Sequence, residues 1–145
     1  MRSVADLLSG VEAAIGGVAA GAAQSQSEWA GLKAQATAGT LRMEPGVAEA
    51  CATACEVAHQ SLRDELQNTQ RLTRVDGLGS WPSGESIARK FQDKSGVDTS
   101  SANSAVGVIR LHQRVLLEMR DTFRAAGQAY AATEQANVDR LRGSS

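Results

Sequence analysis

The sequence predicts an all-α protein built on a long antiparallel helical hairpin, at about residues 45–75 and 101–141. In both stretches apolar residues recur at spacings of three and four, the period of a helix with one buried face. Aromatic residues make up only 3% of the chain, and runs of Ala, Gln, Glu, Arg and Leu favour helices. At 145 residues we expect one domain, residues 1–145, with an N-terminal helical segment (1–40) and the hairpin (41–141).

The sequence of the N-terminal segment predicts an additional helix with one apolar face. Val4, Leu7, Val11 and Ile15 share this face, and we expect them to be partner-facing because the two hairpin helices can bury each other's stripes without them. Four glycines weaken the helix, at about 1 kcal/mol each relative to Ala. Acidic residues interrupt the apolar run, which argues against a cleaved signal peptide, and no apolar run is long enough to predict a membrane span.

The first hairpin helix has a clear start signal. Pro45 suits the first helical position, and Glu44 favours the positive end of the helix dipole. We expect this helix to end near Val75. Its apolar stripe comprises Val47, Cys51, Ala54, Cys55, Ala58, Leu62, Leu66, Thr69 and Leu72.

The connection DGLGSWPSGE carries the glycines and proline of a loop. Ser83 can cap a short helix near residues 84–94, in which Ile87 and Phe91 stand one turn apart. We expect Trp81 and Pro82 to pack on these two side chains and fix the hairpin turn.

The last helix is predicted from Ser101 to about Leu141. Its apolar stripe includes Ala105, Val108, Ile109, His112, Val115, Leu116, Met119, Phe123, Ala126, Tyr130 and Thr133. Forty residues span about 60 Å, longer than a small domain is wide, so we expect half of a hairpin. The first helix is shorter, so the end of the last helix, around residues 131–141, should project beyond it.

Charge and motifs exclude several classes of function. The chain has 15 basic and 16 acidic residues, so nothing favours nucleic acid as a partner. Phosphate-binding glycine loops and the common hydrolase motifs are missing from the sequence. His112 lies on the apolar stripe, where a half-buried histidine is expected rather than a general base. We therefore expect no enzyme activity and no cofactor.

Cys51, Cys55 and His59 recur at intervals of four, which aligns them along one helix face. Such a row can bind a soft metal. Alternatively, both thiols pack as small apolar groups beside Ala54 and Ala58, which is the reading we favour. Helical geometry disfavours a disulfide between them, and reduced thiols agree with folding in the cytoplasm.

The stretch AYAATEQANVDRL contains the only tyrosine of the chain, Tyr130, four residues before Glu134. On a helix the two side chains share one face. Together with Trp81 in the connection and the long amphipathic last helix, this pair resembles the helical-hairpin proteins of actinobacterial type VII (ESX-like) secretion, the WXG100-like superfamily. The resemblance covers residues 41–141 and implies that the Y-x-x-x-D/E element, here Tyr130 and Glu134, is an export signal.

The match to this family departs from its pattern at two places. The family expects hydrophobic residues three and seven positions after the acidic residue, and these positions hold Asn137 and Leu141. The string Trp-Ala-Gly at Trp29 fits W-x-G literally. Trp81, Pro82 and Gly84 have the family's position in the turn but not its spelling. We favour Trp81 as the hairpin-turn tryptophan.

The resemblance implies a secretion substrate or co-secreted partner, cytoplasmic before export and then secreted or at the cell surface. It would pair through helical faces with another hairpin protein or a larger secreted effector, and present its signal to the type VII secretion ATPase. The alternative is a cytosolic helical interaction protein, such as a chaperone or immunity-type partner, in which the Tyr130/Glu134 spacing is coincidental.

Overall fold

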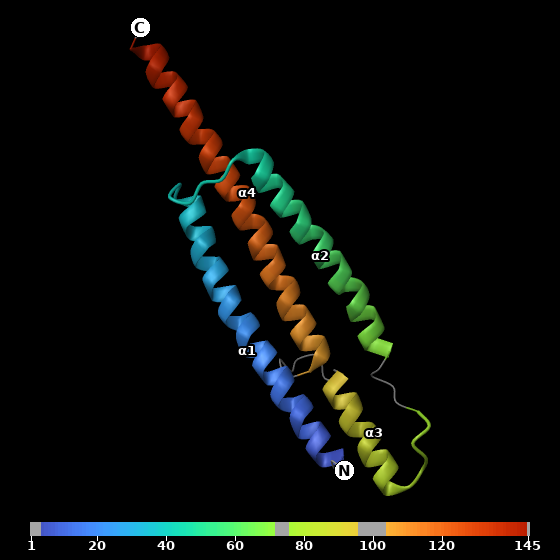
Figure 1. The fold of residues 1–145 in the computed structure, drawn as a ribbon. Helices are drawn as coiled ribbons and strands as arrows, with labels where there is room; N and C mark the ends of the chain where they lie inside the picture. Colours follow the sequence, from blue (N-terminus) through green and yellow to red (C-terminus); the bar gives the residue numbers. More distant parts are fainter. Residues whose placement is uncertain (1–3, 72–75, 96–103, 145) are drawn as a thin grey trace. The chain divides into compact units, whose positions relative to one another are not determined.

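The protein is all-α, as the sequence predicts. The computed structural model describes the backbone of residues 4–71, 76–95 and 104–144, and the side chains of residues 21–71, 76–94 and 104–144. These residues form four helices and no strand: α1 (Val4–Thr37), α2 (Pro45–Arg71), α3 (Pro82–Ser95) and α4 (Ala105–Gly143) (Figure 1).

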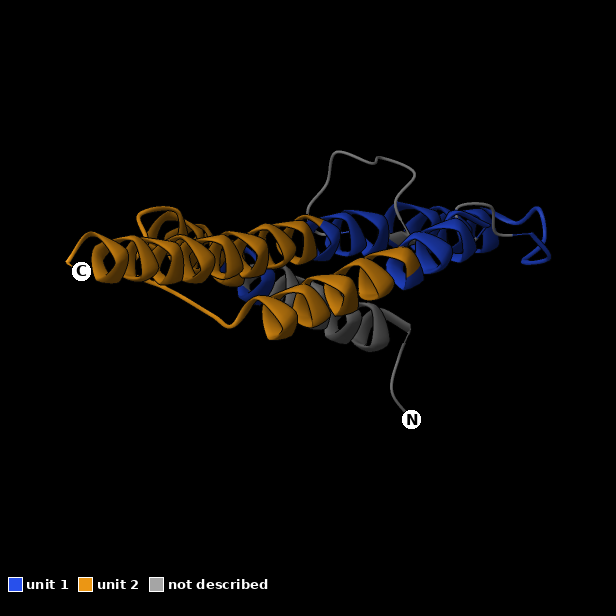
Figure 2. Ribbon diagram, turned by 90° about the horizontal axis from the view of Figure 1, so that it is seen from above, with its two compact units in different colours: residues 1–24, 61–113 blue, residues 25–60, 114–145 orange. Residues whose placement is uncertain are grey.

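Two compact units divide the chain (Figure 2). Unit 1 contains residues 1–24 and 61–113, and unit 2 contains residues 25–60 and 114–145. The boundaries fall inside α1, α2 and α4, so each of these helices contributes to both units. Each unit therefore contains a part of the N-terminal segment (1–40) and a part of the segment 41–141.

Helix α1 lies within the predicted N-terminal helical segment (1–40), and the Ser/Gln-rich patch at residues 24–27 is part of it. It ends at a glycine. Gly39 has a φ of 84°, a conformation that residues with a Cβ rarely adopt. The Gly39 amide donates to the Ala36 carbonyl at 3.1 Å and the Thr40 amide donates to the Gln35 carbonyl at 3.0 Å. These two bonds form a Schellman motif, which satisfies the last carbonyls of α1 and turns the chain back.

Helix α2 begins at Pro45, the predicted first position. The carboxylate of Glu44 accepts hydrogen bonds from the amides of Gly46 at 3.0 Å and Val47 at 2.8 Å, and so caps the helix. These two amide donors hold the pKa of Glu44 below its ordinary value. The helix is described as far as Arg71, so its predicted end at Val75 lies outside the described residues.

The starts of α3 and α4 differ from their predicted positions. Helix α3 begins at Pro82, where the Glu85 amide donates to the Trp81 carbonyl at 3.0 Å. Ser83 therefore lies inside the first turn and is not the cap. Helix α4 begins at Ala105, and the hydroxyl of Ser104 accepts a hydrogen bond from the Gly107 amide at 3.0 Å. Proline at the first position and serine at the N-cap explain both starts.

Small side chains dominate the core of unit 2, which α1, α2 and α4 build together. The buried residues here are Ala36, Ala48, Ala52, Cys55, Val115, Thr122 and Ala126. A Cβ at Gly127 would lie 2.9 Å from the Cβ of Ala48, so α2 and α4 approach each other closely there. Large aromatic side chains meet at one place, where Trp29 contacts Phe123 edge-on with ring centroids 5.5 Å apart.

Charged side chains line the contacts of α4 with α1 and α2. The Arg124 guanidinium lies 3.1 Å from the carboxylate of Glu49 and 3.0 Å from that of Glu56, while Arg120 reaches Glu56 at 4.0 Å. Residue numbers therefore rise along α2 as they fall along α4, which is the antiparallel order. On α1, the Lys33 amine lies 3.5 Å from the Glu118 carboxylate.

Unit 1 contains the connection between α2 and α3. Gly77 and Gly79 have φ values of 90° and 81°, which only glycine adopts readily. A Cβ on Gly84 would lie 2.2 Å from the Leu78 carbonyl oxygen, so glycine is required where the loop crosses the first turn of α3. Among the side chains of this unit that the structure describes, the buried ones are Ala22, Ser104, Val106 and Leu111.

Candidate recognition surface at the end of α4

Four contacts fix the part of α4 that precedes its C-terminal end. Arg124 pairs with Glu49 and Glu56 on α2. The Met43 amide donates to the Ala126 carbonyl at 3.1 Å, and the Arg42 guanidinium donates to the Thr133 hydroxyl at 3.1 Å. The connection between α1 and α2 thus holds α4 as far as Thr133.

After Thr133 every residue of α4 is exposed, from Glu134 to Gly143. We call these ten residues the terminal segment. Figure 1 shows this end of α4 extending past the connection between α1 and α2. A hydrogen bond of 2.9 Å from the Gln135 amide group to the Asp139 carboxylate stays within the segment. The segment is therefore held in place by its helical continuity with the packed part of α4.

Tyr130 and Glu134 lie where the packed part of α4 gives way to the terminal segment. Tyr130 is 37% exposed and Glu134 is exposed. Leu141 is 72% exposed and, by helical geometry, lies within about 20° of Tyr130 around the helix axis. These three residues form one accessible face, which we call the terminal face. It joins an aromatic ring, a carboxylate and an aliphatic side chain, the elements that a protein receptor can read.

Val138 is a second exposed aliphatic side chain of the terminal segment, at 39%. It lies about 80° from Tyr130 around the axis, at the edge of the terminal face, whereas Asn137 lies about 20° from Tyr130. Asn137 therefore occupies the position at which the family pattern expects a hydrophobic residue, and Val138 widens the face beside it.

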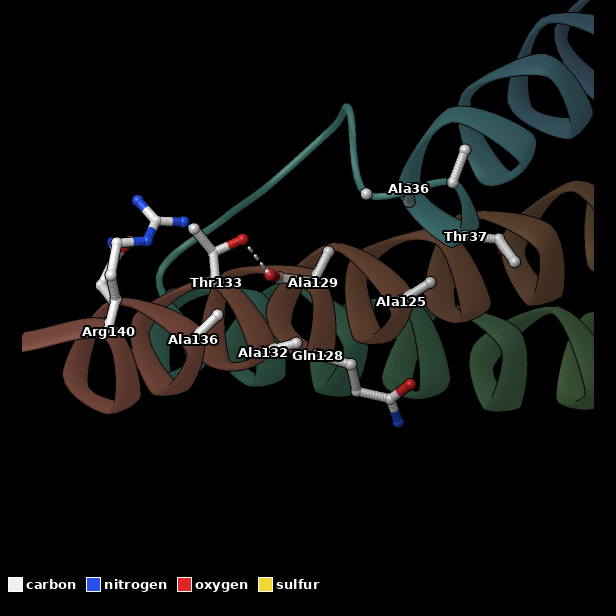
Figure 3. A pocket seen from close by; sticks show the side chains of 12 residues that line it. Ala36, Thr37, Ala125, Gln128, Ala129, Ala132, Thr133, Ala136 and Arg140 are labelled. Atoms are coloured by element: carbon white, nitrogen blue, oxygen red, sulfur yellow. Dashed lines mark hydrogen bonds between the residues drawn. The ribbon is translucent and has the colours of Figure 1, made fainter. Parts of the chain in front are cut away.

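A groove runs between the end of α1 and the last part of α4 (Figure 3). Its volume is about 530 Å³, and its walls are mainly small side chains with Arg140 at one end. The Thr133 hydroxyl, which donates to the Ala129 carbonyl at 2.9 Å, lies on one wall. The groove exists because α1 stops at Gly39 while α4 continues. Half of its lining residues are alanines, so the groove has few charged groups that could bind a ligand.

The packing that the sequence predicts for Trp81 is wrong. Trp81 directly precedes α3 and is 78% exposed, and Phe91 is 47% exposed, so Trp81 does not form a buried aromatic cluster with Ile87 and Phe91. Pro82 and Gly84 lie in the first turn of α3, and their role is to start that helix and to admit the Leu78 carbonyl. Trp29, which the sequence analysis ranks second, contacts Phe123 instead.

The thiols and histidines occupy separate environments. Cys55 is buried, and burial raises the pKa of its thiol, which keeps it protonated and unreactive at neutral pH. Cys51 and His59 are half-buried, as is His112. Within the described residues, no three His, Cys, Asp or Glu side chains converge as a metal site would require.

The N-terminal face of Val4, Leu7, Val11 and Ile15 belongs to α1, but its side chains lie outside the described residues. Its partner-facing role stays a prediction. Over the described residues, none of the helices combines the length and the apolar character that crossing a bilayer requires.

Sequence reasoning missed the attachments that define where the terminal segment begins. Arg42 and Thr133 are 91 residues apart in the chain, and nothing in their local sequence links them. Gly127, by contrast, carries a signal: a glycine inside a strongly helical, alanine-rich run costs helix stability, so it indicates a close helix contact.

Comparison with known proteins adds no relative. No protein-family model matches the chain, and neither does any curated protein or any solved structure.

Proposed function

We propose that the protein is a type VII (ESX-like) secretion substrate or co-secreted partner, which acts by binding and not by catalysis. It pairs through helical faces with another helical-hairpin protein or with a larger secreted effector. Tyr130 and Glu134 are its export signal, and the secretion ATPase reads them. The protein is cytoplasmic before export and then secreted or held at the cell surface.

The observation that carries the proposal is the exposure of the terminal face at the end of α4. A receptor can approach Tyr130, Glu134 and Leu141, because all three residues are exposed and the contact of Arg42 with α4, at Thr133, lies before all of them but Tyr130. The antiparallel order of the α2–α4 contacts further supports the helical hairpin on which the family resemblance depends.

The test is an export assay in an actinobacterial host with an active type VII system. We expect Tyr130→Ala with Glu134→Ala to abolish appearance of the protein in the culture medium while its cytoplasmic level is maintained. Gln135→Ala with Asp139→Ala is the matched control. This pair has the same spacing in the same segment, but lies about 140° from the terminal face, and it should be exported normally.

Normal export of the Tyr130/Glu134 double variant contradicts the signal role and favours the alternative, a cytosolic helical interaction protein. Loss of export in both double variants contradicts it as well, since the effect would then belong to the whole segment. Circular dichroism of the purified variants verifies that each keeps the helicity of the parent.

A further inference from the structure

Helix α2 exposes a strip of apolar side chains on the side turned away from its core contacts. Val47, Ala50, Ala54 and Val57 form this strip, and we call it the α2 strip. Val47 is 52% exposed, Val57 is 63% exposed, and both alanines are exposed. Since Ala48, Ala52 and Cys55 fill the buried side of the same helix, the α2 strip is additional to the face that α2 needs for its own fold.

The spacing of the residues in the α2 strip indicates which type of secondary structure fits against it. Its residues follow one another at intervals of three, four and three, the pattern of positions a and d in a coiled coil. The two central residues are alanines, which allow a second helix to approach closely. The fitting occupant is therefore an α-helix laid along α2.

The order and charge of the strip favour a second copy of the same chain. Read in either direction, the strip is Val, Ala, Ala, Val. In an antiparallel pair about a two-fold axis, Val47 of one copy consequently faces Val57 of the other, and Ala50 faces Ala54. The two-fold axis repeats each of these contacts.

The acidic side chains of this part of α2 do not oppose such a pair. Glu49 and Glu56 are the only charged residues between Pro45 and Ala58, and Arg124 of the same copy holds both, at 3.1 and 3.0 Å. Two identical strips thus meet without like charges at the seam, whereas a helix with a charged seam would bury that charge unpaired.

From this we infer that the protein self-associates through an antiparallel pair of α2 strips. The next seam position, Ser61, is polar and exposed, so the seam is short and the interface belongs to the small class. The dimer is therefore weak and forms at high protein concentration. This inference does not depend on the export role, since it concerns α2 and not the terminal face.

Sedimentation equilibrium over a range of protein concentrations tests the association. We expect a reversible monomer–dimer equilibrium for the parent protein, and dissociation constants at least about tenfold higher for Ala54→Glu, which places an unpaired charge in the seam. Ala50→Glu should act in the same way. Ala30→Glu, at an exposed alanine of α1, is the matched control and should leave the equilibrium unchanged.

Cysteine cross-linking tests the direction of pairing. In a background of Cys51→Ala and Cys55→Ala, a tagged Ala50→Cys chain is mixed with an untagged Ala54→Cys chain and oxidised. Antiparallel pairing predicts more cross-linked product in the mixture than with either variant alone, because position 50 faces position 54. Parallel pairing predicts the reverse.

A parent protein that stays monomeric at the highest concentration overturns the inference and leaves the α2 strip to a helix of another protein. A dimer that Ala54→Glu and Ala50→Glu do not weaken overturns it too. Glutamate is a good helix former, so neither substitution is expected to unfold α2, and circular dichroism verifies this.

Discussion

The part of α4 that belongs to unit 2 is one continuous helix, but its two ends have opposite roles. Between Val115 and Gly127, α4 packs against α1 and α2 through small side chains, an aromatic pair and ion pairs. Between Glu134 and Gly143, every side chain is exposed. Each tract contains two arginines and two acidic residues, but the packed tract has five large apolar side chains and the exposed tract has two. The two tracts are also separated by where α1 ends and α2 begins, at Thr37 and Pro45.

The difference teaches that a surface for recognition arises here by leaving a helix uncovered. A substitution in the packed tract should change the free energy of unfolding with little direct effect on recognition, and one in the terminal segment should do the reverse. Four measurements can break or sharpen this contrast.

The largest expected effect is in the aromatic contact of the packed tract. Trp29→Ala removes a half-buried ring from Phe123, and we expect it to lower the free energy of unfolding by about 2–3 kcal/mol. Trp81→Ala is the matched control, since Trp81 is 78% exposed, and should cost under about 0.5 kcal/mol. Urea denaturation measures both. A larger loss for Trp81 would restore the sequence-based choice of tryptophan.

Next in size is the close contact between α2 and α4. Gly127→Ala introduces a Cβ 2.9 Å from that of Ala48, so the helices must separate, and this strain should cancel or exceed the gain in helix propensity. Gly31→Ala, with nothing within 4 Å of its new Cβ, should stabilise the protein by about 0.5–1 kcal/mol. Equal melting temperatures for the two variants would mean that α2 and α4 are not in close contact at Gly127.

Acid should weaken unit 2 by a smaller amount. Backbone amides lower the pKa of Glu44, and a hydrogen bond from Arg124 lowers that of Glu49. A folded-state pKa below the ordinary value of about 4.5 means that the stabilisation is present above pH 4.5 and is lost as the pH falls through the folded values. Both carboxylates are exposed, so the effect is modest.

Thermal unfolding between pH 6 and pH 3 measures this loss. Glu44→Gln with Glu49→Gln should unfold at a lower temperature than the parent at pH 6, and should show a flatter decline towards pH 3. A parent protein whose melting temperature does not fall across this range would show that neither carboxylate stabilises the fold.

The smallest expected change in stability is at the terminal segment. Tyr130→Ala with Glu134→Ala should alter the free energy of unfolding by no more than about 0.5 kcal/mol, because Glu134 has no packing to lose and Tyr130 is partly exposed. Denaturation of the same sample used for the export assay makes the comparison direct. A loss of 2 kcal/mol or more, on the scale of a core substitution, would identify Tyr130 as a packing residue.

The sequence by itself determined the helices, because the signals that start and stop them are local. Pro45 with Glu44 began α2 where predicted, and the apolar periodicity of the last helix located α4 to within a few residues. The projection of the end of α4 was also expected from the helix lengths, since a helix of 39 residues cannot be covered along its whole length by one of 27. Residues 24–27 are Ser and Gln, which permit helix and loop alike, and in the structure they are part of α1.

Tertiary structure alone decided which side chains those helices bury. Trp29 and Phe123 are 94 residues apart in sequence, and the pair forms because α1 runs on to Gly39 and brings Trp29 against α4. The terminal segment begins at Glu134, directly after Thr133, whose hydroxyl accepts a hydrogen bond from Arg42 in the connection between α1 and α2. A single helix has one periodicity but several possible neighbours, and only the packing of all three helices in unit 2 selects the face that remains open to a partner.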